Sequence, residues 1–227
     1  GGLLGLEAAY GLARAGAAVT LLHLVNRLME RQLDHEGAGL LAAAMTVRGI
    51  DVRLCAETKG FRGRDRVEAV ALTDGSEIPA DLVVIAIGVR PNTGLARAAG
   101  LAVGRGILVD DGLATDDPAI FAIGECAEHR GLAYGLVEPA YEQARVLARH
   151  LAGADVSYDG SVVATNLKVS GVSVFSAGDF TGAAGSDTIV LSDINCGTYK
   201  KLVISDGRLT GAVLIGDVGD ALWYFEL

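Results

Sequence analysis

The chain has 227 residues, of which 51% are hydrophobic and 21% charged. These values are close to those of ordinary globular domains, so a disordered or fibrous chain is excluded. Nineteen basic residues against 28 acidic ones give a net charge of −9, which disfavours nucleic-acid binding because that role needs clustered Lys and Arg. No apolar run approaches the roughly 18 residues of a membrane helix, so we expect a soluble protein without a membrane partner.

The three cysteines, Cys55, Cys126 and Cys196, show no redox or metal-binding spacing. We therefore expect no metal site, and reduced thiols of the kind typical of a cytoplasmic protein. No residue is assigned as catalytic from the sequence. His129, beside Glu128, is expected at the surface.

The first 88 residues alternate helical and strand patterns. A glycine-rich start leads into a helix that ends near Gly16, followed by a strand at 18–22, a helix capped by Asp34 and a strand at 51–54. This order predicts an α/β, Rossmann-like domain in which helices cover a parallel sheet in three layers. Residues 67–79 indicate an antiparallel excursion, and residues 82–87 predict a fully buried strand ending at Gly88.

The rest of the chain divides near residue 153. Before that point the pattern predicts a short helix at 95–99, strands at 107–109 and 120–123, and a helix at about 139–151. After it the pattern is mostly that of a small β-rich, α+β domain. Its expected strands are 162–167, 189–191, 199–204, 209–215 and 222–225, with an Asp-Gly hairpin at Asp206–Gly207.

Gly2 and Gly5 fit the second and third glycines of the dinucleotide fingerprint GxGxxG. Without a Cβ, Gly2 lets a pyrophosphate approach the helix start, and Gly5 lets the helix approach a strand. A plain glycine-rich turn is the competing interpretation. An acid at the end of the following strand favours NAD, and basic residues there accommodate the extra phosphate of NADP. Because His23 and Arg27 stand at this position, the sequence does not decide between NADH and NADPH. Arg27 contacts the 2′-phosphate of NADP in one interpretation and is a solvated helix residue in the other.

A second candidate site follows the strand expected at 120–123. The strand leads to Gly124 and Glu125 at its carboxyl end, where α/β sheets bind ligands. A carboxylate there can accept a hydrogen bond from a ribityl or ribose hydroxyl. The helix start at Glu138 and Pro139 offers free N–H groups to an electron-rich partner. An ordinary strand-end acid and an ordinary capped helix are the competing interpretations.

Taken together, these stretches resemble the FAD-dependent pyridine nucleotide-disulfide oxidoreductases. The resemblance covers nearly the whole chain, with residues 164–227 the weakest part. Within the family, LMERQLD (28–34) and GECAEHRG (124–131) are similar to the large subunit of nitrite-reductase-type members. The other matching stretches are GGLLGLEAAYGLARAGAAVTLL, IAIGVRPNT, TDDPAIFAIGECAEHRG and YGLVEPAYEQARVLARHL.

The resemblance implies a relay in which NAD(P)H passes hydride to FAD, and FAD passes electrons to a metal centre or a small redox protein. It implies an NAD(P)H-binding domain at 1–88, the C-terminal portion of an FAD-binding domain at 89–153, and a β-rich interface domain at 154–227 that forms a homodimer. By position it assigns Gly2, Gly5 and Glu7 to the nucleotide loop, Gly88 to the end of the nicotinamide domain, Gly124 and Glu125 to the second flavin motif, and Glu138 and Pro139 to the helix start facing the flavin.

The sequence departs from the family pattern at three points. Glu125 stands where the family usually has Asp, and His23 replaces the ribose-binding acid. The chain opens in mid-motif, without the first flavin segment and the first nucleotide-domain strand, so the strands near Val19 and Leu82 face a gap with unpaired backbone groups, which are costly to bury. We therefore expect a piece of a larger protein, with an incomplete residue 1–88 domain, no independent FAD retention and no activity of its own.

Two other functions stay open at this point. A ferredoxin- or rubredoxin-type reductase shares the same module, and a non-catalytic dimerisation module is a third reading. No residue here forms a sirohaem or nitrite site, so nitrite as the final acceptor rests on the resemblance alone.

Overall fold

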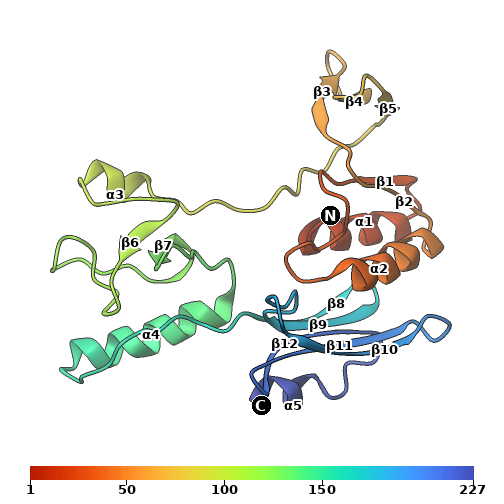
Figure 1. Cartoon of the computed structure of the whole chain (residues 1–227). Coiled ribbons are helices and arrows are strands. Elements are labelled where there is room, and N and C mark those ends of the chain that lie inside the picture. Colours follow the sequence, from red (N-terminus) through yellow and green to blue (C-terminus); the bar gives the residue numbers. More distant parts are fainter. The chain divides into compact units, whose positions relative to one another are not determined.

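The structure is a computed structural model that describes all 227 residues and contains two compact units. One unit joins residues 1–87 to residues 164–227, and the other comprises residues 88–163. The elements of each can be followed in Figure 1. No helix is long and apolar enough to cross a bilayer.

The first unit opens with the expected glycine-loop, helix and strand order. Helix α1 (Leu3–Arg14) precedes strand β1 (Val19–Leu22), and helix α2 (His35–Val47) leads to strand β2 (Ile50–Arg53). β1 and β2 pair in parallel, with Val19 opposite Ile50. Asp34 precedes α2 and caps it: its Oδ1 accepts a hydrogen bond from the Gly37 amide at 3.1 Å, the usual way to satisfy a free N–H at a helix start.

The antiparallel excursion is a three-stranded sheet of β3 (Thr58–Arg62), β4 (Ala69–Leu72) and β5 (Glu77–Pro79). After it, the strand expected at residues 82–87 is absent, and that prediction was wrong. Leu82, Ile85 and Ile87 are 66%, 62% and 90% exposed. An apolar run becomes a buried strand only where neighbouring strands supply hydrogen bonds on its edges, and no strand pairs with this segment.

The C-terminal part of the first unit is a five-stranded antiparallel sheet in the order β10-β11-β12-β9-β8. The strand at β9 was not expected from the sequence. The strand expected at 222–225 is instead part of helix α5 (Ala221–Glu226), because Ala221 and Tyr224, three residues apart, face the same small core. The strands are β8 (Ala164–Val169), β9 (Val172–Gly178), β10 (Asp187–Asp193), β11 (Thr198–Ser205) and β12 (Arg208–Ile215).

A common core joins the two chain segments of the first unit. Leu6 of α1 and Leu41 and Met45 of α2 belong to one buried cluster with Val174 of β9 and Val213 of β12. Figure 1 shows α1 and α2 beside one face of this sheet. The chain therefore returns, after residues 88–163, to pack on the helices with which it began.

A polar contact at the start of α2 supports the same packing. The hydroxyl of Tyr199 donates to Asp34 Oδ2 at 2.6 Å, and Lys201 Nζ lies 3.4 Å from the same oxygen. Burial, with Asp34 as a further cause, raises the pKa of Tyr199, so the hydroxyl keeps its proton and remains a donor. Asp34 thus caps α2 and links the helix to β11.

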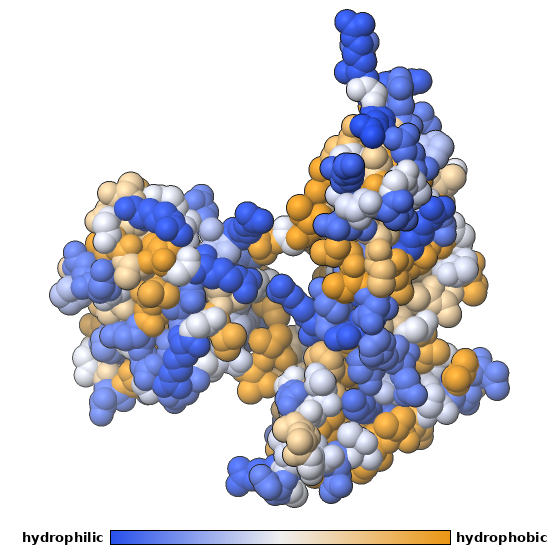
Figure 2. All heavy atoms as spheres, turned by 45° about the horizontal axis from the view of Figure 1, so that its top comes forward, coloured by the Kyte–Doolittle hydropathy of each residue, from blue (hydrophilic) through white to orange (hydrophobic).

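The second unit contains α3 (Gly94–Ala98), β6 (Ile107–Val109), the short 3₁₀ turn η1 (Gly124–Cys126), β7 (Ala127–His129) and α4 (Val137–Leu151). The strand expected at 120–123 is reduced to a single bridge between Ala114 and Phe121. The strand that pairs in parallel with β6 is β7, which begins after Gly124 rather than before it. Figure 2 shows hydrophobic residues at the surface, and large hydrophobic side chains are exposed in both units.

Candidate functional site

The two glycines of the opening loop have different surroundings. Gly2 precedes α1 with an extended backbone, and no side chain caps the helix, so N–H groups of its first turn remain available. A methyl group on Gly2 would meet no atom within 4 Å, whereas one on Gly5 would lie 3.4 Å from the Cβ of Ala86. One position is open and the other is closely packed, which is the arrangement that a nucleotide loop requires.

His23 follows β1 and lies beside this loop. Its ring would collide with a Cβ at Gly1, and its Nε2 lies 3.2 Å from Glu30 Oε2. Arg27 turns back on its own loop, where Nη2 donates to the Glu30 carbonyl oxygen at 3.2 Å and the buried Nε has no partner. The loop therefore supplies a carboxylate near the strand end that the sequence appeared to lack.

Glu30 was missed because it lies seven residues beyond His23 in an irregular loop, where no periodicity relates the two positions. A histidine followed seven residues later by a glutamate is too common in proteins to have indicated the contact. Only the path of the loop brings the carboxylate back to the end of β1.

Glu7 contacts the C-terminal sheet of the first unit, and Gly88 begins the second unit. Glu7, on the second turn of α1, accepts a hydrogen bond from the Ser170 amide through Oε1 at 2.6 Å. Gly88 has a φ of +94° in an extended stretch and would meet no neighbour with a Cβ. Within the first unit, the structure thus brings Gly2, Gly5 and His23 together.

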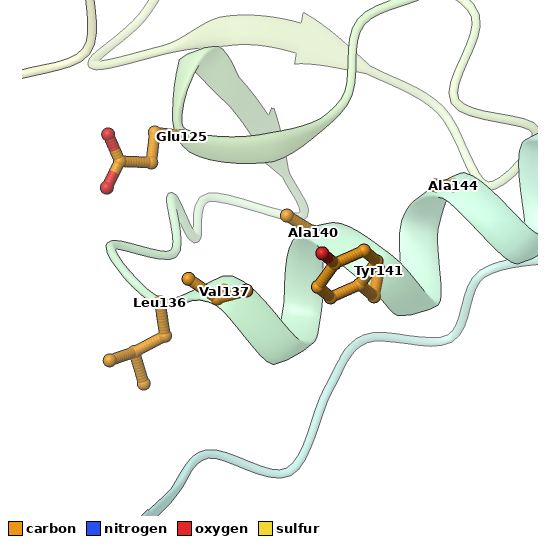
Figure 3. Close-up of a pocket in the computed structure, with 6 residues that line it drawn as sticks. All are labelled: Glu125, Leu136, Val137, Ala140, Tyr141 and Ala144. Carbon is orange, nitrogen blue, oxygen red and sulfur yellow. The ribbon is translucent and has the colours of Figure 1, made fainter.

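The second candidate site lies wholly within residues 88–163. A shallow depression of about 280 Å³ is lined by Glu125 and by an otherwise apolar set of side chains from the start of α4. Figure 3 shows Glu125 above the helix start, with Leu136, Val137 and Tyr141 near it. The full lining consists of Glu125, Leu136, Val137, Ala140, Tyr141 and Ala144.

The start of α4 combines an exposed acid with a buried proline. Glu138 is exposed and its Oε1 lies 3.3 Å from Arg145 Nη2, while Pro139 is buried in the first turn. A proline is favourable there because its missing N–H would have had no helical partner. Leu136 precedes the helix without a side-chain cap, so other N–H groups of this turn remain free.

Gln143 is a site residue that the sequence did not reveal. It is 1% exposed, and its Oε1 accepts a hydrogen bond from the Gly124 amide at 2.7 Å, while Nε2 has no partner. Gly124 has a φ of +80°, which favours glycine. A polar residue on the inward stripe of α4 was the available signal, but its partner lies 19 residues earlier in the chain.

His129 is buried, which corrects the expectation that it lies at the surface. It is 2% exposed, its Nε2 lies 2.9 Å from Asp111 Oδ1, and its ring centre is 4.8 Å from that of Tyr158. Hydrogen bonds from Arg130 first, and from His129 second, lower the pKa of Asp111 to about 2. Asp111 therefore remains ionised and fixes the end of β7.

Comparison with known proteins places these segments in a family. Residues 1–150 match the pyridine nucleotide-disulphide oxidoreductases, and residues 164–227 match the rubredoxin NAD⁺ reductase C-terminal domain. Over 228 aligned residues and 100% of its length, the chain is 50% identical to an NAD(P)H nitrite reductase of Bacillus subtilis. It is 42% identical, over 96% of its length, to the assimilatory nitrate reductase electron transfer subunit of the same organism. It spans 28% of the length of each of these relatives.

A solved structure shows the same fold. A ferredoxin reductase from Rhodopseudomonas palustris superposes with a TM-score of 0.89 at 29% identity, covering 100% of this chain and 57% of that one. The chain therefore shares its fold with part of that ferredoxin reductase. The chain belongs to the pyridine nucleotide-disulphide oxidoreductase family.

Proposed function

We propose that this chain is the NAD(P)H-to-flavin module of a larger oxidoreductase that delivers electrons to a nitrite-reducing metal centre. The observation that carries the proposal is the match of the whole chain, at 50% identity, to an NAD(P)H nitrite reductase, together with the open glycine loop at α1. When bound, NAD(P)H supplies a hydride and FAD accepts it for onward transfer as single electrons.

The residues at α1 fit the phosphate part of a dinucleotide. The uncapped first turn presents N–H donors, and the absence of a Cβ at Gly2 leaves the approach to them open. The helix dipole favours an anion at this end by about 0.3–1 kcal/mol. In the proposal, Gly2 admits the phosphates, Gly5 keeps α1 close to the 82–87 segment, and Glu30 and His23 face the adenosine ribose.

The residues of the second unit fit a flavin. An apolar depression beside the free N–H groups of α4 accepts a flat, largely apolar ring with electron-rich atoms at its edge. Glu125 would accept a hydrogen bond from a ribityl hydroxyl. Gly88 would end the nicotinamide domain, Glu138 and Pro139 would orient the first turn of α4, and Gln143 would hold the Gly124 backbone that carries Glu125.

An anaerobic titration of the full-length protein that contains this chain tests the proposal. We expect a flavin absorption band that bleaches on addition of NADH or NADPH and recovers on addition of nitrite. A protein that carries flavin and is reduced, but is not reoxidised by nitrite, would retain the reductase module and exclude nitrite as the acceptor. A protein without a flavin band would refute the proposal.

A second candidate is a ferredoxin- or rubredoxin-type reductase that reduces a small redox protein. It is supported by the match of residues 164–227 to the rubredoxin NAD⁺ reductase C-terminal domain and by the structural similarity to a ferredoxin reductase. Rapid reoxidation of the reduced flavin by a small iron–sulfur protein, with no reoxidation by nitrite, would favour this candidate. The same assay therefore separates the two.

The compartment, the domain boundaries and the oligomeric state of the module can also be proposed. We propose the cytoplasm as its compartment, since Cys55, Cys126 and Cys196 are all free thiols. We also propose that residues 1–88 form an NAD(P)H-binding domain, residues 89–153 the C-terminal portion of a flavin-binding domain, and residues 154–227 an interface domain that joins two copies of the protein. The mass of the full-length protein in solution tests the dimer.

A further inference from the structure

The hairpin between β8 and β9 reaches across to α1 with a very tight turn. Val169 pairs with Val172, so the loop consists only of Ser170 and Gly171. Their φ angles are +50° and +82°. Such a two-residue loop matches the twist of an antiparallel pair, but a serine with positive φ is uncommon.

Ser170 makes two hydrogen bonds to α1, where its first turn meets its second. Its amide donates to Glu7 Oε1 at 2.6 Å, and its hydroxyl donates to the Leu6 carbonyl oxygen at 3.0 Å. Ser170 is 1% exposed, and Val169 beside it is buried in the same core cluster as Leu6. The hairpin tip is thus attached to α1 by polar contacts and by packing.

The contacts of Ser170 with Leu6 and Glu7 connect the hairpin to the glycine loop. The Leu6 amide donates to the Gly2 carbonyl oxygen at 3.1 Å, which closes the first turn of α1. The same turn carries the free N–H groups that face the nucleotide in the proposed function. A shift at Leu6 therefore moves the donors of the loop.

A second hairpin in the same sheet provides a comparison. Asp206 and Gly207 connect β11 and β12 with the same loop length and with φ angles of +52° and +73°. Asp206 is exposed, and its side chain makes no hydrogen bond. The backbone form of the Ser170 turn thus serves a hairpin without any contact to α1, so the buried hydroxyl of Ser170 has a separate role.

We propose that Ser170 is a positioning residue for the nucleotide loop: it fixes the first turn of α1 and thereby sets the affinity for the pyridine nucleotide. The inference rests on the proposed function, because it concerns the same loop. It assigns the C-terminal sheet a part in nucleotide binding, although the sheet supplies none of the expected nucleotide-binding residues. In this proposal Glu7, which accepts a hydrogen bond from the Ser170 amide, also holds α1 against the hairpin.

The test compares Ser170→Gly with Asp206→Gly in the full-length protein. Glycine adopts positive φ freely, so both hairpins keep their backbone and only Ser170→Gly loses a contact to α1. We expect Ser170→Gly to weaken binding of NADH or NADPH by roughly three- to tenfold, the range for loss of one neutral hydrogen bond. Turnover at saturating nucleotide should stay within about twofold, and Asp206→Gly should match the wild type. Equal affinities for the two variants would overturn the proposal.

Amide hydrogen exchange in the absence of nucleotide is the second measurement. We expect faster exchange at residues 3–7 in Ser170→Gly than in Asp206→Gly, and no difference would overturn the proposal. Glu7 is exposed, so Glu7→Leu should remain folded and should show the same acceleration, whereas Glu7→Gln keeps an oxygen acceptor and should not. If the wild type binds no pyridine nucleotide, the proposed function fails, and the exchange data still decide whether Ser170 holds the helix.

Discussion

A substitution at Gly2 is expected to weaken nucleotide binding with little effect on the stability of the fold. Its φ of −82° is accessible to any residue, and an added Cβ meets nothing within 4 Å. Gly2→Ala should therefore change the free energy of unfolding by no more than about 1 kcal/mol. It should weaken nucleotide binding by roughly tenfold or more, about 1.4 kcal/mol, because in the proposed function the methyl group would stand where the pyrophosphate approaches.

Gly11→Ala is the matched control for this prediction. Gly11 lies within α1 and is also free of neighbours, so the change should stabilise the protein by about 0.5–1 kcal/mol and leave nucleotide affinity unchanged. Urea unfolding and equilibrium titration with NADH and NADPH provide the two readouts. Unchanged affinity in Gly2→Ala would remove Gly2 from the binding site.

The ionisation of Asp111 makes the stability of the second unit depend on pH in the acidic range. Hydrogen bonds from Arg130 and His129 lower its pKa from 3.8 to about 2. A carboxyl group with a lowered pKa in the folded state stabilises the protein above its unfolded pKa, and this contribution is lost as the pH falls through the folded pKa. The stability difference between wild type and Asp111→Asn should therefore be constant above about pH 5 and shrink between about pH 4 and pH 2.

Urea unfolding of both proteins over this pH range measures that difference. Comparison with Asp111→Asn cancels the titration of the other carboxyl groups, which the two proteins share. A difference that stays constant down to about pH 3 would show that Asp111 makes no ionic contact in the folded protein.

The candidate site residues that the sequence analysis named include glycines, which it can identify from their type and spacing. Gly124 has a φ of +80°, which favours glycine, and such a position appears directly in the sequence. Gly2 and Gly5 were proposed from their spacing in the fingerprint. Glu30 and Gln143 were not predictable, because each acquires its role from a contact that the folded path of the chain creates. His129 was placed wrongly for the same reason, since Asp111 and Tyr158 surround it.

Helix α4 and the turn η1 depend on one another through Gln143. Replacing Gln143 by leucine leaves the Gly124 amide without its acceptor, and an unsatisfied buried polar group costs about 1–3 kcal/mol. We expect Gln143→Leu to lower the free energy of unfolding by that amount and to weaken FAD retention in the full-length protein. The loss of retention should follow because Glu125 is carried by the same turn.

Arg149→Leu serves as the control on the same helix. Arg149 is exposed in the last turn of α4, so its loss should change the free energy of unfolding by less than about 0.5 kcal/mol. Unfolding curves and the ratio of flavin to protein absorbance measure both effects. Full flavin content in Gln143→Leu would show that the turn does not need this hydrogen bond to hold its form.

At the level of elements, the sequence predicted helices better than short strands. α1, α2 and α4 were placed correctly because their periodicity extends over 12–15 residues. The apolar runs at 82–87 and 222–225 are too short for periodicity to separate strand from helix or loop. The first lacks a pairing strand, and the second packs with helical spacing, so in both cases tertiary contacts decided the conformation.

At the scale of the whole chain, the first and last segments share one core while a separate unit is inserted between them. Stability of the glycine-loop region thus depends on residues more than 160 positions away, as the contacts of Glu7 with Ser170 and of Asp34 with Tyr199 show. A substitution in the C-terminal sheet can therefore affect the nucleotide loop without altering any residue in it.

The exposed 82–87 segment leads to a prediction about residues 1–227 expressed alone. Ile87 is 90% exposed, and β1 pairs only with β2. We expect the separate polypeptide to bind a hydrophobic dye, to self-associate and to retain little FAD, because this apolar segment has no covering strand. The longer protein should bind less dye and show a flavin band.

Ile87→Ser distinguishes an exposed segment from one that is buried in the longer protein. In residues 1–227 alone the change should alter the free energy of unfolding by less than about 0.5 kcal/mol, since the side chain already lies in solvent. In the longer protein, burial of the segment between neighbouring strands should make the same change cost at least about 2 kcal/mol. Equal small effects in both proteins would show that residues 82–87 remain exposed there too, and that flavin retention depends on other parts of the protein.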